Sequence, residues 1–357
     1  MTNKSKGMRI GILTAGGDCP GLNAAIRGVG KTAIAEYGMK VFGFSSGFTG
    51  IIKNEYIELF EPDLSGILTV GGTILGTSRE KPFKKTSNGI KGEKAEQIIK
   101  NYKDLKLDAL VCIGGNGSQR TASQLAETGL NIVGIPKTID NDVWGTDYSF
   151  GFDSALWIDT EAIDRLHTTA NSHKRIMVIE VMGHHAGWLA LYSGIAGGGD
   201  VVLIPEIEYD EKIICDYLHK RFRQKKPYSI VVVAEGARPQ GGDYTVLRKV
   251  EESHDQIRLG GISYVVGQEI EERTGIETRV VILGHLQRGG SPTPFDRVLA
   301  SRFGAAAVDL VANEQFGYFP ALKGNEIVPT LMKKAISSLK TIPLNHSLLD
   351  VARSTGT

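Results

Sequence analysis

Few cysteines, no long apolar run and almost no net charge characterise this chain of 357 residues. Its three cysteines, Cys19, Cys112 and Cys215, lie far apart without metal-binding spacing, which favours a reducing compartment. No apolar run approaches the roughly 20 residues that span a bilayer, and the run at 10–13 is too short for the core of a signal peptide. The formal charge of +1 gives no indication of a nucleic acid or an anionic membrane as partner. We therefore expect a cytoplasmic globular protein that binds neither.

Glycine is abundant, with 44 residues gathered in short clusters after apolar runs. The first cluster, at 14–21, lies between a predicted strand at 8–13 and a predicted helix at 22–37. A loop in this position can hold phosphate, because backbone N–H groups approach the anion and the helix N-terminus adds its dipole. The loop matches neither G-x-x-x-x-G-K-[ST] nor G-x-G-x-x-G, so a glycine turn without a ligand is an equally good interpretation of this loop alone.

The succession of strand, glycine turn and helix recurs at least three times before residue 140. A strand at 109–113 leads to the glycine turn 114–118 and a helix at 119–127, and a further glycine turn at 71–79 ends in Arg79. Such alternation predicts a doubly wound parallel sheet with its loops at one edge. Several glycine turns at one edge indicate a large polyanionic ligand. We expect the polar stretch 83–94 to be an exposed loop.

A polar turn at 136–142 reads Pro-Lys-Thr-Ile-Asp-Asn-Asp and follows an apolar run at 131–135. We expect Pro136 to end that strand, because proline lacks the N–H of the ladder. In an extended turn, Asp140 and Asp142 could face one site beyond the carboxyl end of the strand, where open α/β sheets bind ligands. A solvated turn is the alternative interpretation.

The second half of the chain repeats the alternation, with a domain boundary expected near 145–152. Helices are predicted at 154–170, 211–224, 262–274 and 294–313, and strands at 176–182, 201–204, 229–234 and 278–283. The tail predicts hairpin-like connections and a weak helix. The expected fold class is α/β, with two doubly wound domains and mainly parallel sheets.

Five stretches taken together, at 16–23, 114–118, 136–142, 182–184 and 284–290, resemble the motifs of the bacterial-type 6-phosphofructokinases in the family's order. The resemblance covers about residues 8–330. It implies a phosphoryl-donor domain at 8–148 plus about 287–335, a sugar-phosphate domain at 149–286 plus the C-terminal tail, and an active site in the cleft between them. It also implies a glycolytic kinase that transfers phosphate from Mg-ATP to the 1-hydroxyl of fructose 6-phosphate. The expected assembly is a homodimer or homotetramer with shared substrate sites.

The resemblance also assigns roles to single residues. Asp140 is the expected general base for the sugar hydroxyl, which a carboxylate within hydrogen-bond reach can be. Thr138, Lys137 and His184 are expected at the transferred group. The expected sugar-phosphate contacts are Met182, Gly183, His184, Glu235, His285, Arg288, Arg175 and Arg279, the last two from the adjacent subunit. The expected donor contacts are Gly16, Phe48, Arg79, Asn116, Gly117 and Ser118, with Asn116 and Asp142 as Mg²⁺ ligands.

Gly117 favours ATP as the donor, because glycine leaves room for the α-phosphate where pyrophosphate users carry an aspartate. Lys137 is usual in pyrophosphate users, although it also occurs beside the glycine in ATP users. His184 replaces the family's usual arginine and Asn116 its usual aspartate; we hypothesise that Lys137 supplies part of the missing positive charge. The alternatives are a pyrophosphate-dependent enzyme, a catalytically impaired regulatory member, and a dinucleotide-binding oxidoreductase, which the absent fingerprint disfavours. Longer substrates such as sedoheptulose 7-phosphate stay open.

Overall fold

The computed structural model describes residues 5–86, 89–249 and 257–357. The chain forms two compact units, each built from several segments. Unit 1 comprises Met1–Thr138, Val143–Ser154 and Arg288–Leu339, and unit 2 comprises Ile139–Asp142, Ala155–Gln287 and Lys340–Thr357. No helix in the described part of the chain is long and apolar enough to cross a membrane.

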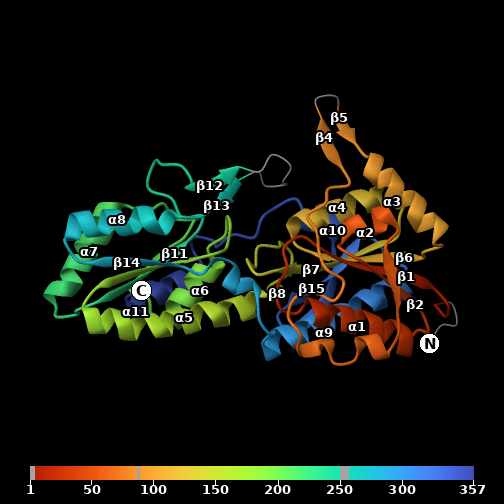
Figure 1. The fold of residues 1–357 in the computed structure, drawn as a ribbon, viewed down its shortest axis with the longest axis horizontal. Helices are drawn as coiled ribbons and strands as arrows, with labels where there is room; N and C mark the ends of the chain where they lie inside the picture. The colour runs from red at the N-terminus through yellow and green to blue at the C-terminus, as the bar shows by residue number, and fades with distance from the viewer. Residues whose placement is uncertain (1–4, 87–88, 250–256) are drawn as a thin grey trace. The chain divides into compact units, whose positions relative to one another are not determined.

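Unit 1 is built on a six-stranded sheet in the order β3-β2-β1-β6-β7-β8 (Figure 1). All neighbouring strands are parallel except β3, which runs antiparallel to β2. The near-continuous burial of the central strands is typical of parallel sheets covered on both faces. The strands are β1 (Arg9–Ala15), β2 (Lys40–Phe44), β3 (Tyr56–Leu59), β6 (Ala109–Gly114), β7 (Ile132–Thr138) and β8 (Phe150–Gly151).

Helices cover both faces of this sheet, with α1 and α9 together on one face and α2, α3 and α4 on the other (Figure 1). Gly28 and Gly304 let α1 and α9 approach closely, because a methyl group on Gly28 would lie 2.8 Å from the Ser301 carbonyl oxygen. The helices are α1 (Leu22–Ala35), α2 (Phe48–Lys53), α3 (Glu93–Asp104), α4 (Asn116–Glu127), α9 (Pro294–Ala312) and α10 (Met332–Ala335). Two antiparallel hairpins complete the unit, β4 (Lys84–Thr86) with β5 (Gly89–Lys91) and β15 (Tyr318–Lys323) with β16 (Glu326–Leu331).

Unit 2 is built on a four-stranded parallel sheet in the order β10-β11-β9-β14. Its strands are β9 (Ile176–Val181), β10 (Val201–Leu203), β11 (Ser229–Ala234) and β14 (Thr278–Ile282). Helices α7 (Glu211–Arg223) and α8 (Ile262–Thr274) lie on one face of the sheet, and α5 (Phe152–His173), α6 (Trp188–Ala196) and α11 (Ser347–Thr355) lie on the other (Figure 1). The short hairpin β12 (Val246–Lys249) with β13 (Ile257–Leu259) and the 3-10 helix η3 (Gly284–Arg288) complete the described elements.

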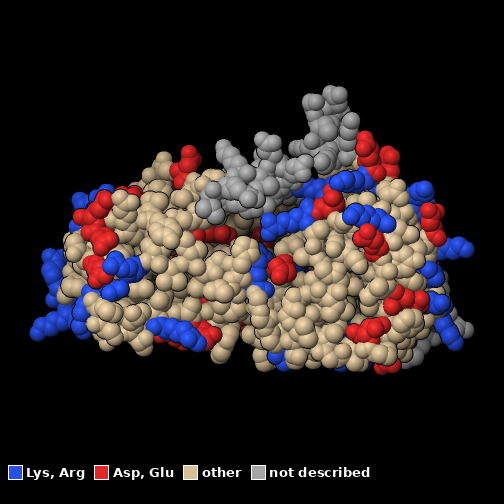
Figure 2. Space-filling model, in the orientation of Figure 1, with Lys and Arg blue, Asp and Glu red and all other residues tan. Residues whose placement is uncertain are grey.

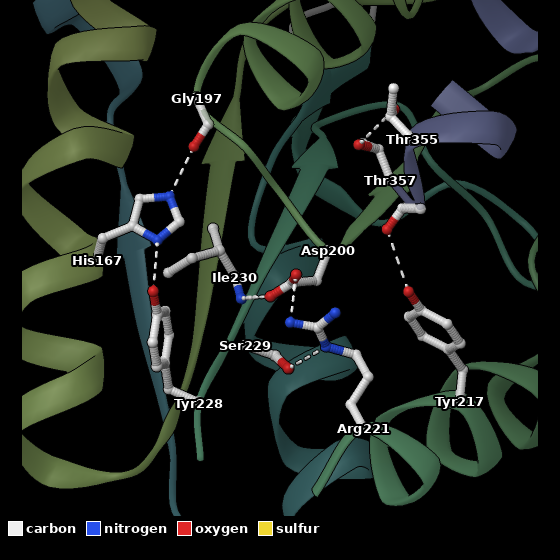
Figure 3. A network of polar contacts seen from close by, with 11 residues as sticks. His167, Gly197, Asp200, Tyr217, Arg221, Tyr228, Ser229, Ile230, Thr355 and Thr357 are labelled. Atoms are coloured by element: carbon white, nitrogen blue, oxygen red, sulfur yellow. Dashed lines mark hydrogen bonds and ion pairs between the residues drawn. The ribbon is translucent and has the colours of Figure 1, made fainter. Parts of the chain in front are cut away.

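A buried polar network ties the amino ends of these strands to the helices around them (Figure 3). Arg221 pairs with Asp200 and donates to Ser229 Oγ at 3.0 Å, and Asp200 accepts from the Ile230 N–H at 3.0 Å. Burial raises the pKa of Asp200, against the opposing effect of Arg221. His167 bonds the Gly197 carbonyl at 2.6 Å. This end of the sheet is thereby fixed by side chains outside the predicted motifs.

The predicted end of β7 at Pro136 is wrong. Pro136 lies opposite Gly114, the last residue of β6, so the pairing of β7 with β6 ends at this point. The N–H that proline lacks is therefore not needed to continue the hydrogen bonds between these two strands. Beyond it, β7 pairs with β8 on its other side, through Lys137 opposite Phe150 and Thr138 opposite Gly151. Lys137 and Thr138 therefore belong to the strand, and only the residues after them form the turn.

The α/β class with mainly parallel sheets is confirmed, and so are the helix at 262–274 and the hairpin in the tail. The exposed loop predicted at 83–94 is wrong in part, because β4 and β5 lie there. Helix α2 and strand β3 were not predicted, since both are short. On the face drawn in Figure 2, basic and acidic side chains are interspersed on the surface of each unit.

Candidate active site

The carboxyl ends of β1, β6 and β7 bring Gly16, Ser118 and Lys137 together in unit 1. Gly16 has a φ of +87°, and a methyl group placed on it would lie 3.1 Å from Ser118 Oγ and 4.0 Å from Lys137 Nζ. Glycine is needed there both for the left-handed backbone and for the close approach. We call Gly16, Gly17, Asn116, Gly117, Ser118 and Lys137 the glycine-loop cluster.

Lys137 places a buried cation against this loop. Its side chain projects from β7, the residue is 3% exposed, and Nζ donates to the Gly17 carbonyl oxygen. A buried ammonium group retains its charge when acceptors or anions lie close by. An anion held by the loop would therefore meet a fixed positive charge.

Asn116, Gly117 and Ser118 form the first turn of α4, not a loop before the helix as predicted. The N-cap residue Gly115 provides no side-chain hydrogen bond, so the side chain caps none of the first N–H groups. The N–H groups at a helix N-terminus and the helix dipole favour an anion at this position.

The segment that carries Arg79 is bonded to the same loop. Thr77 Oγ1 donates to the Gly16 carbonyl at 2.8 Å, and the Gly16 N–H donates to the Ser78 carbonyl at 2.9 Å. Arg79, the next residue, is exposed. Thr77 and Ser78 were not singled out from the sequence, although they lie within a predicted glycine turn.

Arg288 also belongs with the glycine loop. Its Nη1 donates to the Asp18 carbonyl at 3.0 Å, and a methyl group on Gly17 would lie 2.7 Å from the same nitrogen. The sequence predicted Arg288 as part of the sugar-phosphate clamp beside His285. Arg288 and His285 both lie in the short 3-10 helix η3, where His285 is exposed, and their role in a sugar-phosphate clamp stays a prediction.

Phe48, which is predicted to lie near the adenosine of a nucleotide, is enclosed in the core of unit 1. The residue is 1% exposed and packs in the hydrophobic core with Phe44, Ile51 and Leu13. Core side chains enclose the ring on the side that faces the sheet, and its contact with a nucleotide stays a prediction.

In unit 2, the carboxyl ends of β9 and β11 bring Met182, Gly183, His184 and Glu235 together. The His184 N–H donates to Glu235 Oε1 at 3.0 Å, and the Glu235 N–H donates to the Val181 carbonyl at 2.9 Å. Gly183 and His184 have φ values of +136° and +55°. Left-handed backbone at a histidine is uncommon and concentrates at functional sites.

The turn after β7 is not extended as predicted, because Asn141 adopts a left-handed φ of +51°. Asn141 is 2% exposed, whereas the flanking Asp140 and Asp142 are both partly exposed. The Asp142 carbonyl accepts from the Lys340 N–H at 2.9 Å. The turn thus buries its amide residue and leaves Asp140 and Asp142 partly exposed, with Oδ1 of Asp140 enclosed by the protein.

Arg175 and Arg279 lie at the opposite end of the unit 2 sheet. Arg175 precedes β9 and Arg279 is the second residue of β14, and both pair with Glu277. Met182 and Glu235 follow the carboxyl ends of β9 and β11, which run parallel to β14 through β9. At roughly 3.3 Å per residue, the six residues of β9 separate the two ends by about 17–20 Å. Within one chain, these two arginines therefore lie at the other end of the sheet from Glu235.

Several buried polar residues that support the site were missed from the sequence. Gln287 Oε1 accepts from the Met182 N–H at 3.1 Å, and Gln119 Nε2 donates to the carbonyls of Gly114 at 3.0 Å and Ile135 at 2.8 Å. Asn23 accepts from the Ile74 N–H at 2.8 Å and so holds the glycine turn near residue 71. Asn23 and Gln287 lie within two of the five motif stretches, but the sequence does not show that their side chains are buried, because amide residues are mostly exposed.

Comparison with known proteins explains this arrangement. A family model described as phosphofructokinase matches residues 9–311. The chain belongs to the phosphofructokinase family. The matched residues include the glycine-loop cluster of unit 1 and the residues around Glu235 in unit 2.

Two curated relatives and one solved structure indicate the range of similar proteins. ATP-dependent 6-phosphofructokinase 3 of Bacteroides thetaiotaomicron is 54% identical, over 98% of this chain and 99% of its own. Pyrophosphate–fructose 6-phosphate 1-phosphotransferase of Amycolatopsis mediterranei is 49% identical, over 95% of this chain and 97% of its own. The phosphofructokinase structure from Saccharomyces cerevisiae is 30% identical with a TM-score of 0.80, covering 98% of this chain, which spans about half (46%) of the yeast chain.

Proposed function

We propose that this protein transfers the terminal phosphoryl group of Mg-ATP to the 1-hydroxyl of fructose 6-phosphate, giving fructose 1,6-bisphosphate and ADP. The observation that carries the proposal is the glycine-loop cluster, where Gly16, Ser118 and a buried Lys137 converge beside the N-terminus of α4, whose N-cap residue is a glycine. Asp140 follows this cluster in the chain after only Thr138 and Ile139. The 54% identity to a curated ATP-dependent relative supports ATP as the donor.

Unit 1 is proposed to hold the donor. The N–H groups of the first turn of α4 and the Ser118 hydroxyl donate to phosphate oxygens, and Arg79 adds a guanidinium group. Gly117 leaves room for the α-phosphate. Lys137 stabilises negative charge on the transferring phosphoryl group, which fixed charges in a dry site do effectively. Arg288, which we propose as a ligand of the 6-phosphate of the sugar, contacts the Asp18 carbonyl beside this set.

Unit 2 is proposed to hold the acceptor. Asp140 accepts the proton of the 1-hydroxyl as its oxygen attacks phosphorus, and Thr138 positions the transferred group. Glu235, oriented by the His184 N–H, accepts hydrogen bonds from sugar hydroxyls. Met182 and Gly183 shape the pocket beside it, and His285 contributes to binding the 6-phosphate.

Asp142 and Asn116 offer the hard oxygen ligands that suit Mg²⁺. Among the described residues no three His, Cys, Asp or Glu side chains gather into a metal site. Two protein ligands suffice for Mg²⁺, which typically binds through one or two carboxylates together with substrate phosphates. When bound, the ion would neutralise charge on the donor's phosphates. We propose that Asp142 holds it more strongly than the neutral Asn116.

A homo-oligomer is proposed to complete the sugar-phosphate site. Arg175 and Arg279 lie an entire strand length from Glu235 within one chain. An adjacent subunit that presents its own Arg175 and Arg279 would bring two bidentate phosphate ligands to the site.

A coupled assay with fructose 6-phosphate, run with ATP and then with pyrophosphate, tests the proposal. We expect turnover with Mg-ATP and at least tenfold less with pyrophosphate. Turnover with pyrophosphate alone would reassign the donor and make Lys137 its determinant. No turnover with either donor, in folded protein that binds fructose 6-phosphate, would indicate a regulatory member of the family.

A further inference from the structure

The C-terminal segment of unit 2 joins two loops that carry candidate site residues. The Lys340 N–H donates to the Asp142 carbonyl at 2.9 Å. Two residues later, the Ile342 N–H donates to Glu206 Oε1 at 2.9 Å. Glu206 also accepts from the Gly187 N–H, with its two oxygens at 3.0 and 3.1 Å. One carboxylate thus holds the loop at 183–187 and the segment that holds Asp142.

The loop is shaped to receive this carboxylate. A methyl group on Gly187 would lie 2.7 Å from Glu206 Oε2 and 2.5 Å from Ile204 Cβ, so only glycine permits the approach. Hydrogen bonds from N–H groups to a carboxylate are shorter and stronger than neutral ones. Glu206 is therefore fitted to the backbone of two segments that are distant in sequence.

Trp188 provides a second attachment for the same segment. This residue follows Gly187, begins α6 and is 5% exposed. Its indole N–H donates to the Lys340 carbonyl at 2.9 Å, and its ring centroid lies 5.3 Å from that of His346 in an edge-on contact. The far end of the segment is held by Tyr217, whose hydroxyl donates to the Gly356 carbonyl at 3.1 Å.

We infer that Glu206 is a positioning residue for phosphoryl transfer. Through the segment at 340–346, it fixes the backbone of the turn that presents Asp140 and Asp142 and of the loop that presents His184. The inference rests on the proposed function, because it assumes that these loops act on the transferring group. Displacement of a reacting group by about 1 Å can cost about a hundredfold in rate, so backbone anchors of this kind govern turnover.

Glu206→Gln tests the inference, since glutamine keeps the volume but loses the charge and one acceptor atom. We expect kcat with fructose 6-phosphate and ATP to fall about tenfold, with the KM for ATP unchanged within about twofold, because the proposed donor contacts belong to unit 1. Hydrogen exchange should accelerate about tenfold in peptides covering 183–190 and 339–346. Glu208→Gln is the matched control: Glu208 pairs with Arg238 at 3.1 Å and should leave kcat and exchange in both peptides unchanged.

Trp188→Phe removes the indole donor without changing charge and should give the same pattern. Both residues act through one segment. The fold-decrease in kcat of the double variant should therefore be smaller than the product of the fold-decreases in the two single variants. Normal kcat in Glu206→Gln beside an active wild type would overturn the positioning role alone. So would a fall in kcat that merely matches the fraction of unfolded protein measured by circular dichroism. A wild-type protein without activity would instead overturn the proposed function.

Discussion

Lys137 combines burial with a full positive charge at the point where phosphate is proposed to bind. Its Nζ contacts the Gly17 carbonyl, and the residue is almost fully buried. We expect Lys137→Met to lower kcat ten- to a hundredfold while the KM for fructose 6-phosphate changes less than threefold, since fixed charge acts mainly on the transition state. Steady-state kinetics measure both values. Lys323→Met, at an exposed lysine paired with Asp147, is the control, and equal kcat in the two variants would contradict the role of Lys137.

We expect Gly117 to determine the donor, because a side chain at this position would add volume and charge. In Gly117→Asp, the added carboxylate occupies the space proposed for the α-phosphate and repels it. We expect the kcat/KM for ATP to fall at least a hundredfold, with a much smaller effect on pyrophosphate, because the transfer site itself is unchanged. Assays with both donors decide this, and unchanged ATP kinetics would refute the steric interpretation.

Single residues differ in how far they could be predicted. Gly16, Ser118 and Lys137 belong to motifs, and the structure brings them together; their catalytic roles stay predictions. Phe48 lies in the core of unit 1, and a sequence position does not tell whether an aromatic ring enters the core or a pocket; its place beside a nucleotide stays a prediction. Gln287 lies in a motif and Glu206 does not, but the contacts of both could not be foreseen, since their partners are backbone groups far along the chain.

The N-terminus of α9 carries a carboxylate that burial strongly affects. Asp296 accepts from the N–H and hydroxyl of Ser154 at 2.8 and 2.6 Å, yet burial raises its pKa from 3.8 to about 7. Folding therefore favours the protonated form. Below about pH 4 the carboxyl contributes fully to the free energy of unfolding, and this contribution is lost as the pH rises to about 7. The shift in pKa corresponds to a loss of at most about 4 kcal/mol in the free energy of unfolding.

Asp296→Asn should remove this contribution to pH dependence, because the amide does not titrate. We expect urea unfolding midpoints of the wild type to fall more steeply between pH 5 and pH 8 than those of the variant. Ser154 keeps an oxygen acceptor in the variant, so packing is retained. Parallel pH profiles for the two proteins would show that Asp296 titrates near its ordinary value.

Among the elements, long periodic segments were predicted well and short or nonlocal ones were not. Helix α8 lies at the predicted residues, since its start and end coincide with glycines at 261 and 275. Strand β7 passes the predicted stop at Pro136 because its pairing changes from β6 to β8, which only the folded sheet reveals. Helix α2 is too short for its periodicity to be recognised.

At the scale of the whole molecule, the separation of Arg279 from Glu235 predicts a site shared between subunits. Mixing inactive Asp140→Asn and Arg279→Ala proteins, after dissociation and reassociation, should restore activity. In a dimer, half of the assemblies are hybrids with one intact site of two, so about a quarter of wild-type activity should return. Activity of the mixture no higher than that of the separate variants would place both residues in one chain's site.

The sequence contains part of this result, because Arg175 precedes a predicted strand and Met182 ends it, so their separation could be foreseen. The attachments of the C-terminal segment could not be, since Lys340 bonds to Asp142 across almost two hundred residues of chain. Such long-range backbone contacts have no local pattern. They depend on how unit 2 is assembled from three separate segments.

The most direct test of the proposed chemistry is the rate of a single turnover by Asp140→Asn, measured by rapid quench with saturating Mg-ATP and fructose 6-phosphate. Asparagine keeps the size of the side chain but cannot accept the proton. We expect the rate of phosphoryl transfer to fall at least about a thousandfold while the affinity for fructose 6-phosphate changes less than about threefold. A rate within tenfold of the wild type would show that another group removes the proton.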